Sequence, residues 1–289
     1  MEVNVHRNLL IPAMGLLLSG VLQSAAAEPA ALASPWASEP HARARLVAGG
    51  RAPGAPAGTL AAGIEIELAD GWKTYWRNPG SSGVPPLLEW PDAANIASVE
   101  MRYPAPGRQS DRGGDTIGYK QHLMLPLVVR PAEPGRDVKL KVQLEYGVCK
   151  DICIPVQTRL DLVIPANAGK QPIASDLARA FDRVPRPLSA RRPSDPDLSN
   201  ASVTLSGERP SIRLDAVFPG GAEDGDVFVE APDGLWIPMA MRDGPAKGDR
   251  ANFVVDLTEG AEIADLKGKT IRITLVSPRG QSETTLKLE

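Results

Sequence analysis

The sequence has little net charge, no long apolar run after its N-terminal region and none of the common catalytic motifs. A formal net charge of −3 over 289 residues argues against nucleic acid as a partner, because proteins that bind it carry basic patches for the phosphates. No later segment reaches the roughly 18 apolar residues of a membrane-spanning helix. We find no glycine-rich phosphate loop, nucleophile elbow or paired-carboxylate pattern. Few residues are therefore left to carry chemistry.

The first 27 residues predict a secretory signal peptide. Arg7 precedes an apolar run over residues 9–22, and three alanines ending at Ala27 form a typical cleavage site. The apolar run is too short to span a bilayer comfortably. We therefore expect cleavage after Ala27, no membrane span in the mature chain, and a soluble protein in a bacterial periplasm. Export also places a cysteine pair where a disulfide can form.

About 260 residues follow the signal, which is enough for two domains. With 28 prolines and 27 glycines, we expect frequent turns and few long helices. Short alternating segments recur with a turn every 8–12 residues or so. We predict an all-β chain, with an immunoglobulin-like β-sandwich over residues 28–165 and a second, smaller β-sandwich over residues 201–289. Residues 166–200 are predicted to be a linker containing a short helix.

Aromatic residues make up only 4% of the chain and gather between Trp72 and Trp76. Strand alternation places Trp72, Thr74 and Trp76 on one face and Tyr75 on the opposite face. We interpret this segment mainly as core packing, with contact to a partner as the alternative. The polar, glycine-containing segment 109–116 is predicted to be a loop and a candidate mobile flap.

Cysteine occurs only twice, at Cys149 and Cys153. Residues 138–146 and 156–164 both alternate between apolar and polar side chains, which is the period of half-buried strands, so we expect the pair at the tip of a hairpin. The Cα atoms of such a pair can come close to the separation of about 4.4–6.8 Å that is usual for a disulfide. A bridge that closes so short a ring contributes only roughly 2 kcal/mol as a structural staple.

Three functions are open to this pair. Thiol–disulfide exchange requires one thiolate exposed enough to attack and a second close enough to resolve the mixed disulfide, and a hairpin tip supplies both. A Cu(I) site would use the thiolates of Cys149 and Cys153, with Met239 and Met241 as further ligands. In the third alternative the bridge is only a staple in a non-catalytic interaction module.

Charged residues near the pair have opposing effects. Lys150 favours a thiolate and Asp151 opposes it. The histidines of the mature chain are His41 and His122, and neither has the short spacing to the cysteines that a metal motif needs. We expect both histidines on the surface or in loops.

Three motifs occur in order between about residue 45 and residue 165. They are GWKTYWRNPG at 71–80, IGYK at 117–120 with LPL at 125–127, and YGVCKDICIP at 146–155. In this order they resemble the N-terminal periplasmic domain of the protein-disulfide reductase DsbD, and more closely its ScsB-type relatives, which are associated with copper tolerance. The second sandwich is similar to an additional β domain of the longer members. DsbD itself has a longer cysteine spacing and an aromatic cap where residues 111–116 are polar here.

The resemblance implies an immunoglobulin-like domain with protein-disulfide reductase-type activity and no dissociable cofactor. Its cysteine pair would take electrons from a membrane-embedded DsbD- or ScsB-like donor on another chain and pass them to periplasmic thioredoxin-like oxidoreductases. By the same resemblance, Cys153 forms the mixed disulfide and Cys149 resolves it. We expect supporting roles for five residues: Tyr119, Tyr146, Lys150, Asp151 and Pro155.

Overall fold

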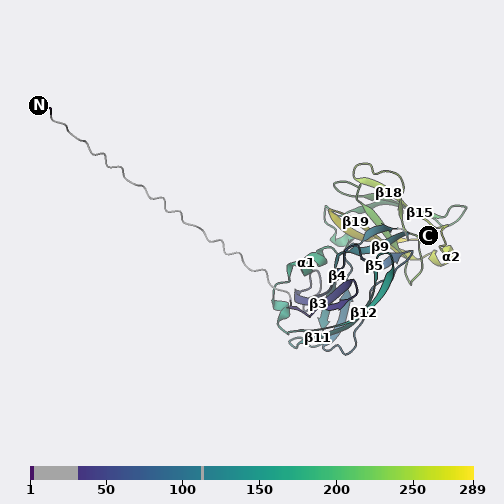
Figure 1. The fold of residues 1–289 in the computed structure, drawn as a ribbon. Coiled ribbons are helices and arrows are strands. Elements are labelled where there is room, and N and C mark those ends of the chain that lie inside the picture. Colours follow the sequence, from purple (N-terminus) through teal and green to yellow (C-terminus); the bar gives the residue numbers. More distant parts are fainter. Residues whose placement is uncertain (3–31, 112–113) are drawn as a thin grey trace.

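The computed structural model describes residues 1–2, 32–111 and 114–289 (Figure 1). The expected signal peptide lies, apart from its first two residues, outside the described residues. None of the helices in the described part of the chain is both long and apolar enough to cross a membrane.

The strands up to residue 164 form two facing sheets, which we call the first sandwich. Sheet A has the order β1-β3-β4-β10-β7, with β2 also paired to β3, and sheet B has the order β12-β11-β5-β9-β8, with β6 paired to β11. The bounds are β1 Leu32–Ala33, β2 Ala37–Glu39, β3 Ala42–Arg51, β4 Leu60–Leu68, β5 Lys73–Gly80, β6 Leu87–Glu89, β7 Ile96–Met101, β8 Gly107–Asp111, β9 Gly114–Lys120, β10 His122–Pro131, β11 Val138–Cys149 and β12 Cys153–Ile164.

Alternation along the strands builds the core of the first sandwich. On β11 the even-numbered side chains from Val138 to Val148 are buried, and on β12 the even-numbered residues from Val156 to Ile164 are buried. They meet the inward side chains of β4 and β10 from sheet A in one apolar cluster. Because successive residues of a strand point to opposite faces, the odd-numbered residues of β11 lie on the outer face of sheet B.

The segment expected to be a flap is instead part of a β-hairpin. Its residues belong to β8 and β9, which pair from Gly107 with Gly118 to Asp111 with Gly114, while residues 112–113 lie outside the described residues. Two of its polar side chains, Gln109 and Thr116, are buried. A strand is predicted from alternating apolar and polar residues, and the segment 109–116 is polar throughout. The sequence pattern therefore gave no sign of these strands.

A helical segment follows the first sandwich. It contains η1 Ala168–Lys170, α1 Ser175–Asp182 and η2 Leu188–Ala190. The apolar face of α1, formed by Leu177, Ala180 and Phe181, packs on the outer face of sheet A against Val47 and Met124. Much of the segment predicted to be a linker is thus held against the first sandwich.

The remaining strands form a second sandwich from two four-stranded sheets. Sheet C has the order β13-β20-β19-β16, and sheet D has the order β14-β15-β18-β17. The bounds are β13 Arg186–Pro187, β14 Asp197–Thr204, β15 Ser211–Val217, β16 Asp226–Glu230, β17 Met241–Arg242, β18 Arg250–Asp256, α2 Ile263–Leu266, β19 Thr270–Ser277 and β20 Gly280–Lys287. The two sheets enclose a separate apolar cluster. The prediction of an all-β chain with two sandwiches is confirmed.

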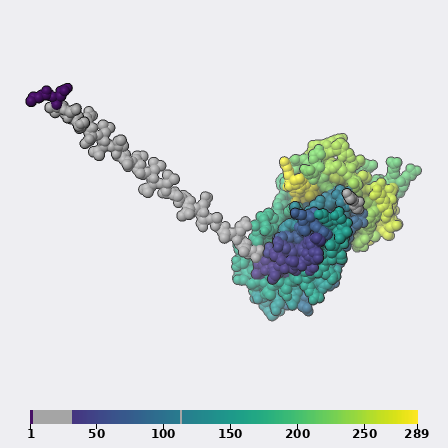
Figure 2. All heavy atoms as spheres, viewed as in Figure 1, coloured from purple at the N-terminus to yellow at the C-terminus, as the bar shows by residue number. Residues whose placement is uncertain are grey.

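The two sandwiches are in direct contact. Phe228 of β16 lies in the apolar cluster of the first sandwich, with its ring 5.9 Å from that of Trp76. Beside it, Arg77 of β5 makes hydrogen bonds of 2.7 and 2.8 Å to Glu230. In Figure 2 the yellow-green C-terminal residues form one lobe against the purple, blue and teal first sandwich.

Candidate functional site

The two cysteines lie at the tip of the β11–β12 hairpin, as the alternation predicts. The register pairs Cys149 directly with Cys153, and the model joins them in a disulfide with a Cα separation of 4.1 Å. Cys149 is only 1% exposed, whereas Cys153 is exposed. One sulfur of the bridge is therefore open to an incoming thiolate and the other is shielded.

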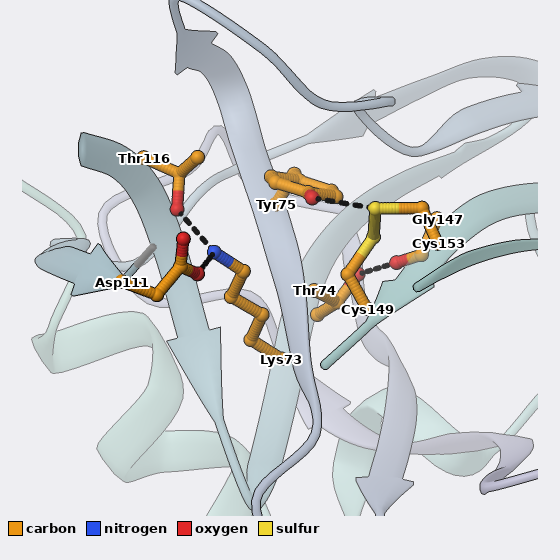
Figure 3. The surroundings of a disulfide bond; sticks show 8 residues. All are labelled: Lys73, Thr74, Tyr75, Asp111, Thr116, Gly147, Cys149 and Cys153. Carbon is orange, nitrogen blue, oxygen red and sulfur yellow. Dashed lines mark hydrogen bonds and ion pairs between the residues drawn. A yellow bond between two sulfur atoms is a disulfide. The ribbon is translucent and has the colours of Figure 1, made fainter. Parts of the chain in front are cut away.

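The neighbouring strand β5 supplies the surroundings of the bridge (Figure 3). Lys73 is the register partner of Cys149, so the odd-numbered residues of β5 share the outer face of sheet B with the cysteines. On the inner face, Thr74 donates a hydrogen bond of 2.9 Å to the carbonyl oxygen of Gly147. This bond ties β5 to β11 two residues before the first cysteine.

Tyr75 is the side chain that reaches the exposed sulfur. Its hydroxyl oxygen lies 3.3 Å from Sγ of Cys153, and its ring is buried. Because a disulfide sulfur carries no hydrogen, the hydroxyl is the donor in this contact. Burial, and then the negative charge of Asp111, raise the pKa of Tyr75, so the phenol keeps its proton at neutral pH.

Two glycines make room for the ring of Tyr75. A Cβ added at Gly83 would lie 2.5 Å from ring carbons, and one added at Gly147 would lie 3.1 Å from the opposite side of the ring. The amide of Gly147 also donates to the carbonyl oxygen of Val84. The β5–β6 connection thus folds over Tyr75, which fixes the ring beside the bridge.

Lys73 connects the site to the β8–β9 hairpin. Its ammonium group lies 2.5 Å from Oδ2 of Asp111 and 2.8 Å from Oγ1 of Thr116, and 5.9 Å from the ring centre of Tyr75. The Lys73 side chain is 8% exposed. A buried ammonium group therefore lies next to Tyr75, with its charge balanced by a carboxylate from the hairpin.

Tyr75 and Lys73 are missing from the residues that the sequence suggested. Alternation had placed Tyr75 on the face opposite Trp72, Thr74 and Trp76, which was the available signal. All four of these residues are buried, and Trp72 and Trp76 belong to the apolar cluster of the first sandwich, in agreement with core packing. Considering the residues on each face of this strand separately would have identified Tyr75 as a candidate for the site.

Tyr119 and Tyr146 lie away from the bridge. Tyr119 is the register partner of Thr74 and so points to the inner face, where its hydroxyl donates to the carbonyl oxygen of Pro104 at 2.8 Å. Tyr146 is on the inner face of β11, and burial raises its pKa. The structure therefore does not bring these two rings to the cysteines.

The other suggested residues surround the hairpin tip. Lys150, Asp151 and Pro155 are exposed, and the Lys150 side chain lies over Gly71. Between the cysteines, Ile152 is 65% exposed. The rim of the exposed sulfur is thus apolar as well as charged.

The two methionines considered as copper ligands occupy a different place. The sulfur atoms of Met239 and Met241 lie 3.9 and 3.5 Å from a guanidinium nitrogen of Arg108. A fixed positive charge opposes a metal cation between these sulfurs. The structure does not gather the thioethers with the cysteine pair.

Comparison with solved structures agrees with the fold. The crystal structure of the N-terminal periplasmic domain of ScsB from Proteus mirabilis is similar over 90% of this chain and 99% of that chain, with 21% sequence identity and a TM-score of 0.66. A marsupial T cell receptor aligns over 88% of this chain and 99% of its own, but with 9% identity and a TM-score of 0.19 it carries no weight. No curated protein sequence matches the chain.

One family model matches the part of the chain that carries the site. Residues 43–165 match the family described as thiol:disulfide interchange protein DsbD, N-terminal. The matched residues include β5, the β8–β9 hairpin and both cysteines. This confirms the resemblance drawn from the three motifs. Over residues 43–165 this chain is therefore similar to the DsbD N-terminal domain family.

Proposed function

We propose that this protein is a periplasmic thiol–disulfide exchange module, which passes reducing equivalents through Cys149 and Cys153. One observation carries the proposal: in the bridge, a shielded sulfur is joined to an exposed sulfur that accepts a hydrogen bond from Tyr75. A staple would need neither the difference in exposure nor a donor beside the open sulfur. The electrons reside in the cysteine pair, so no dissociable cofactor is required.

The exchange has two balanced steps. A donor thiolate attacks Sγ of Cys153, a bond forms between the two proteins, and the Cys149–Cys153 bond breaks to release the Cys149 thiolate. The second thiol of the donor then loses its proton and attacks the mixed disulfide. The donor leaves as a disulfide, and Cys149 and Cys153 hold two electrons and two protons. Transfer to an acceptor disulfide runs the same steps in reverse.

Tyr75 and Lys73 favour this chemistry at Cys153. When the bridge opens, the phenol donates to a thiolate instead of to a neutral sulfur, and hydrogen bonds to charged acceptors are the stronger kind. The ammonium group of Lys73 adds a positive charge on the same face. Both effects lower the pKa of the Cys153 thiol and increase the fraction that can attack.

The proposed partners follow from the family and from the hairpin tip. The donor is a membrane-embedded DsbD- or ScsB-like conduit on another chain, and the acceptors are periplasmic thioredoxin-like oxidoreductases. Ile152 and Val84, which are 65% and 46% exposed, offer apolar contacts next to Cys153. The predicted signal peptide supports the periplasmic location.

A defined mixed disulfide tests the proposal. A thioredoxin-like protein that retains only its exposed cysteine is loaded with thionitrobenzoate and mixed with the reduced Cys149→Ala variant. We expect rapid release of coloured thionitrobenzoate and a stable cross-link to Cys153. The Cys153→Ala variant is the matched control, and it should react slowly because Cys149 is shielded. Equal rates for both variants, or no cross-link with Cys149→Ala, would refute the proposal.

A further inference from the structure

The second sandwich is attached to the first through the same elements that build the site. Strand β5 carries Lys73 and Tyr75 at one end and Arg77 and Asn78 at the other. Arg77 contacts Glu230 of β16 and Glu283 of β20, the latter at 2.7 Å, while Asn78 donates to a backbone carbonyl of β16 at 3.1 Å. The strand that positions the bridge is therefore also bound to the second sandwich.

The β8–β9 hairpin is bound in the same way. Arg108 of β8 forms two hydrogen bonds of 3.0 Å to the carboxylate of Asp226 and one of 2.7 Å to the carbonyl oxygen of Ala240. The same guanidinium lies 3.5 Å from Asp115 of β9, so it contacts both strands of the hairpin. Three residues after Arg108, Asp111 holds the ammonium group of Lys73.

The position of β8 in sheet B makes this attachment important. β8 is the edge strand of the sheet and pairs only with β9 among the strands of the described chain. β9 is also paired with β5, so β8 is the strand of the hairpin that has a neighbour on one side alone. The Arg108 and Asp226 side chains are 18% and 25% exposed, and a partly buried two-point contact between guanidinium and carboxylate constrains geometry more than a surface pair does.

We propose that the second sandwich acts as a brace for the β8–β9 hairpin, with Arg108 and Asp226 as positioning residues that keep Asp111 on Lys73 beside Tyr75 and the bridge. The inference rests on the proposed exchange function and assigns the second sandwich a task in it. Loosening the brace weakens the contact between Asp111 and Lys73. The positive charge near Cys153 is then less well balanced, which favours the thiolate.

The test changes only the second sandwich. In the full-length Asp226→Asn variant, Oδ1 remains to accept the hydrogen bond from the amide of Val227, while the charge facing Arg108 is lost. The reduced protein is alkylated with iodoacetamide over a range of pH, and modification of Cys153 is followed by mass spectrometry. We expect a lower thiol pKa, seen as about two- to threefold faster alkylation below that pKa, because the rate follows the thiolate fraction.

Three variants make the result specific. Asp226→Glu keeps the charge and should retain the wild-type pH profile. Asp111→Asn should shift the profile in the same direction as Asp226→Asn. Asp243→Asn breaks the exposed pair with Arg213 within the second sandwich and should change nothing. Should Asp226→Asn fold poorly by circular dichroism, Arg108→Lys replaces it, since a lysine cannot make the two-point contact.

The outcomes separate this inference from the proposed function. Alkylation needs no protein partner, so it reports on the site whether or not a mixed disulfide forms with a thioredoxin-like protein. A wild-type protein that exchanges normally, together with an Asp226→Asn profile that matches Asp243→Asn or shifts to higher pKa, overturns the brace alone. A shift to lower pKa in both Asp226→Asn and Asp111→Asn supports it.

Discussion

At the scale of single residues, the site depends on one hydrogen bond and one difference in exposure. The phenol of Tyr75 contacts the exposed sulfur of Cys153, while the sulfur of Cys149 is shielded. An exposed sulfur determines where a partner attacks, and a donor beside it determines how readily the thiolate forms. In the proposed exchange, the exposure of Cys153 thus sets where a partner attacks, and the phenol of Tyr75 sets how readily the thiolate forms.

Replacing Tyr75 with phenylalanine tests the donor. The Tyr75→Phe variant keeps the ring between Gly83 and Gly147 but loses the hydroxyl, so the pKa of the Cys153 thiol should rise by about one unit, equivalent to about 1.4 kcal/mol. The pH dependence of alkylation measures this change. Thermal unfolding should stay close to that of the wild type, and an unchanged pKa would show that the hydroxyl has no part in stabilising the thiolate.

At the scale of elements, short polar contacts hold the strands that carry the site in register. Thr74 joins β5 to β11, and Glu65 of β4 joins β3 and β10 through Arg45 and His122. Such contacts lie on the inner face of one sheet and the outer face of the other. Of these contacts, the bond from Thr74 is the one that supports the site at the end of β5.

The Thr74→Val variant tests the bond between β5 and β11. It leaves the carbonyl oxygen of Gly147 without its side-chain donor in a buried position, and we expect the free energy of unfolding to fall by about 1–2 kcal/mol. Urea unfolding measures the difference. Thr285→Val, at an exposed position of β20, is the control and should have an effect within about 0.5 kcal/mol. A similar loss in both variants would contradict a specific role for the bond.

The contacts of Glu65 predict a pH dependence of stability. Burial alone would raise the pKa of Glu65, but hydrogen bonds and charge from His122 and Arg45 outweigh it and hold the pKa below its ordinary value of 4.5. A carboxyl whose pKa is lower in the folded than in the unfolded state stabilises the fold at any pH above its pKa in the unfolded chain. This contribution is lost as the pH falls through the lowered pKa of the folded state. Glu65→Gln should therefore cost about 1–2 kcal/mol near pH 7 and less near pH 3.

Denaturant unfolding at several pH values measures this effect. Glu67→Gln is the matched control, because Glu67 lies on the same strand and pairs with Arg43 in an exposed position. Exposed pairs contribute little to stability. A cost for Glu65→Gln that stays constant from neutral to acidic pH would contradict the assignment.

At the scale of the whole molecule, an aromatic side chain joins the two sandwiches, in addition to the polar contacts between them. Phe228 belongs to a strand of the second sandwich but is buried against Trp76 in the core of the first. Figure 1 shows β5 and β9 next to the strands of the second sandwich. The joint lies at the far end of β5 from the bridge, which is why it can support the site without covering it.

Truncating Phe228 tests this joint. Phe228→Ala removes a buried ring and should cost about 3–5 kcal/mol, and we expect the unfolding of the two sandwiches to separate into two transitions. Differential scanning calorimetry resolves the transitions. Phe253→Ala removes an equally buried ring inside the core of the second sandwich. It should lower the melting temperature of the second sandwich only. A single cooperative transition in Phe228→Ala would show that other contacts couple the sandwiches.

The sequence by itself determined most of the strands, the hairpin with the cysteine pair at its tip, and the similarity of residues 43–165 to the DsbD N-terminal domain family. The alternation of apolar and polar residues and the turn residues are patterns of a few neighbouring positions, so strands and turns can be predicted from them without knowledge of the rest of the fold. Only the tertiary structure decided which strands are neighbours. The pairing of Lys73 with Cys149 joins segments more than seventy residues apart, and it brings Tyr75 to the exposed sulfur. The tertiary structure also places Arg108 against Asp226. Many charged residues could pair with Arg108 as far as the sequence shows, and only the packing of the two sandwiches brings one of them to it.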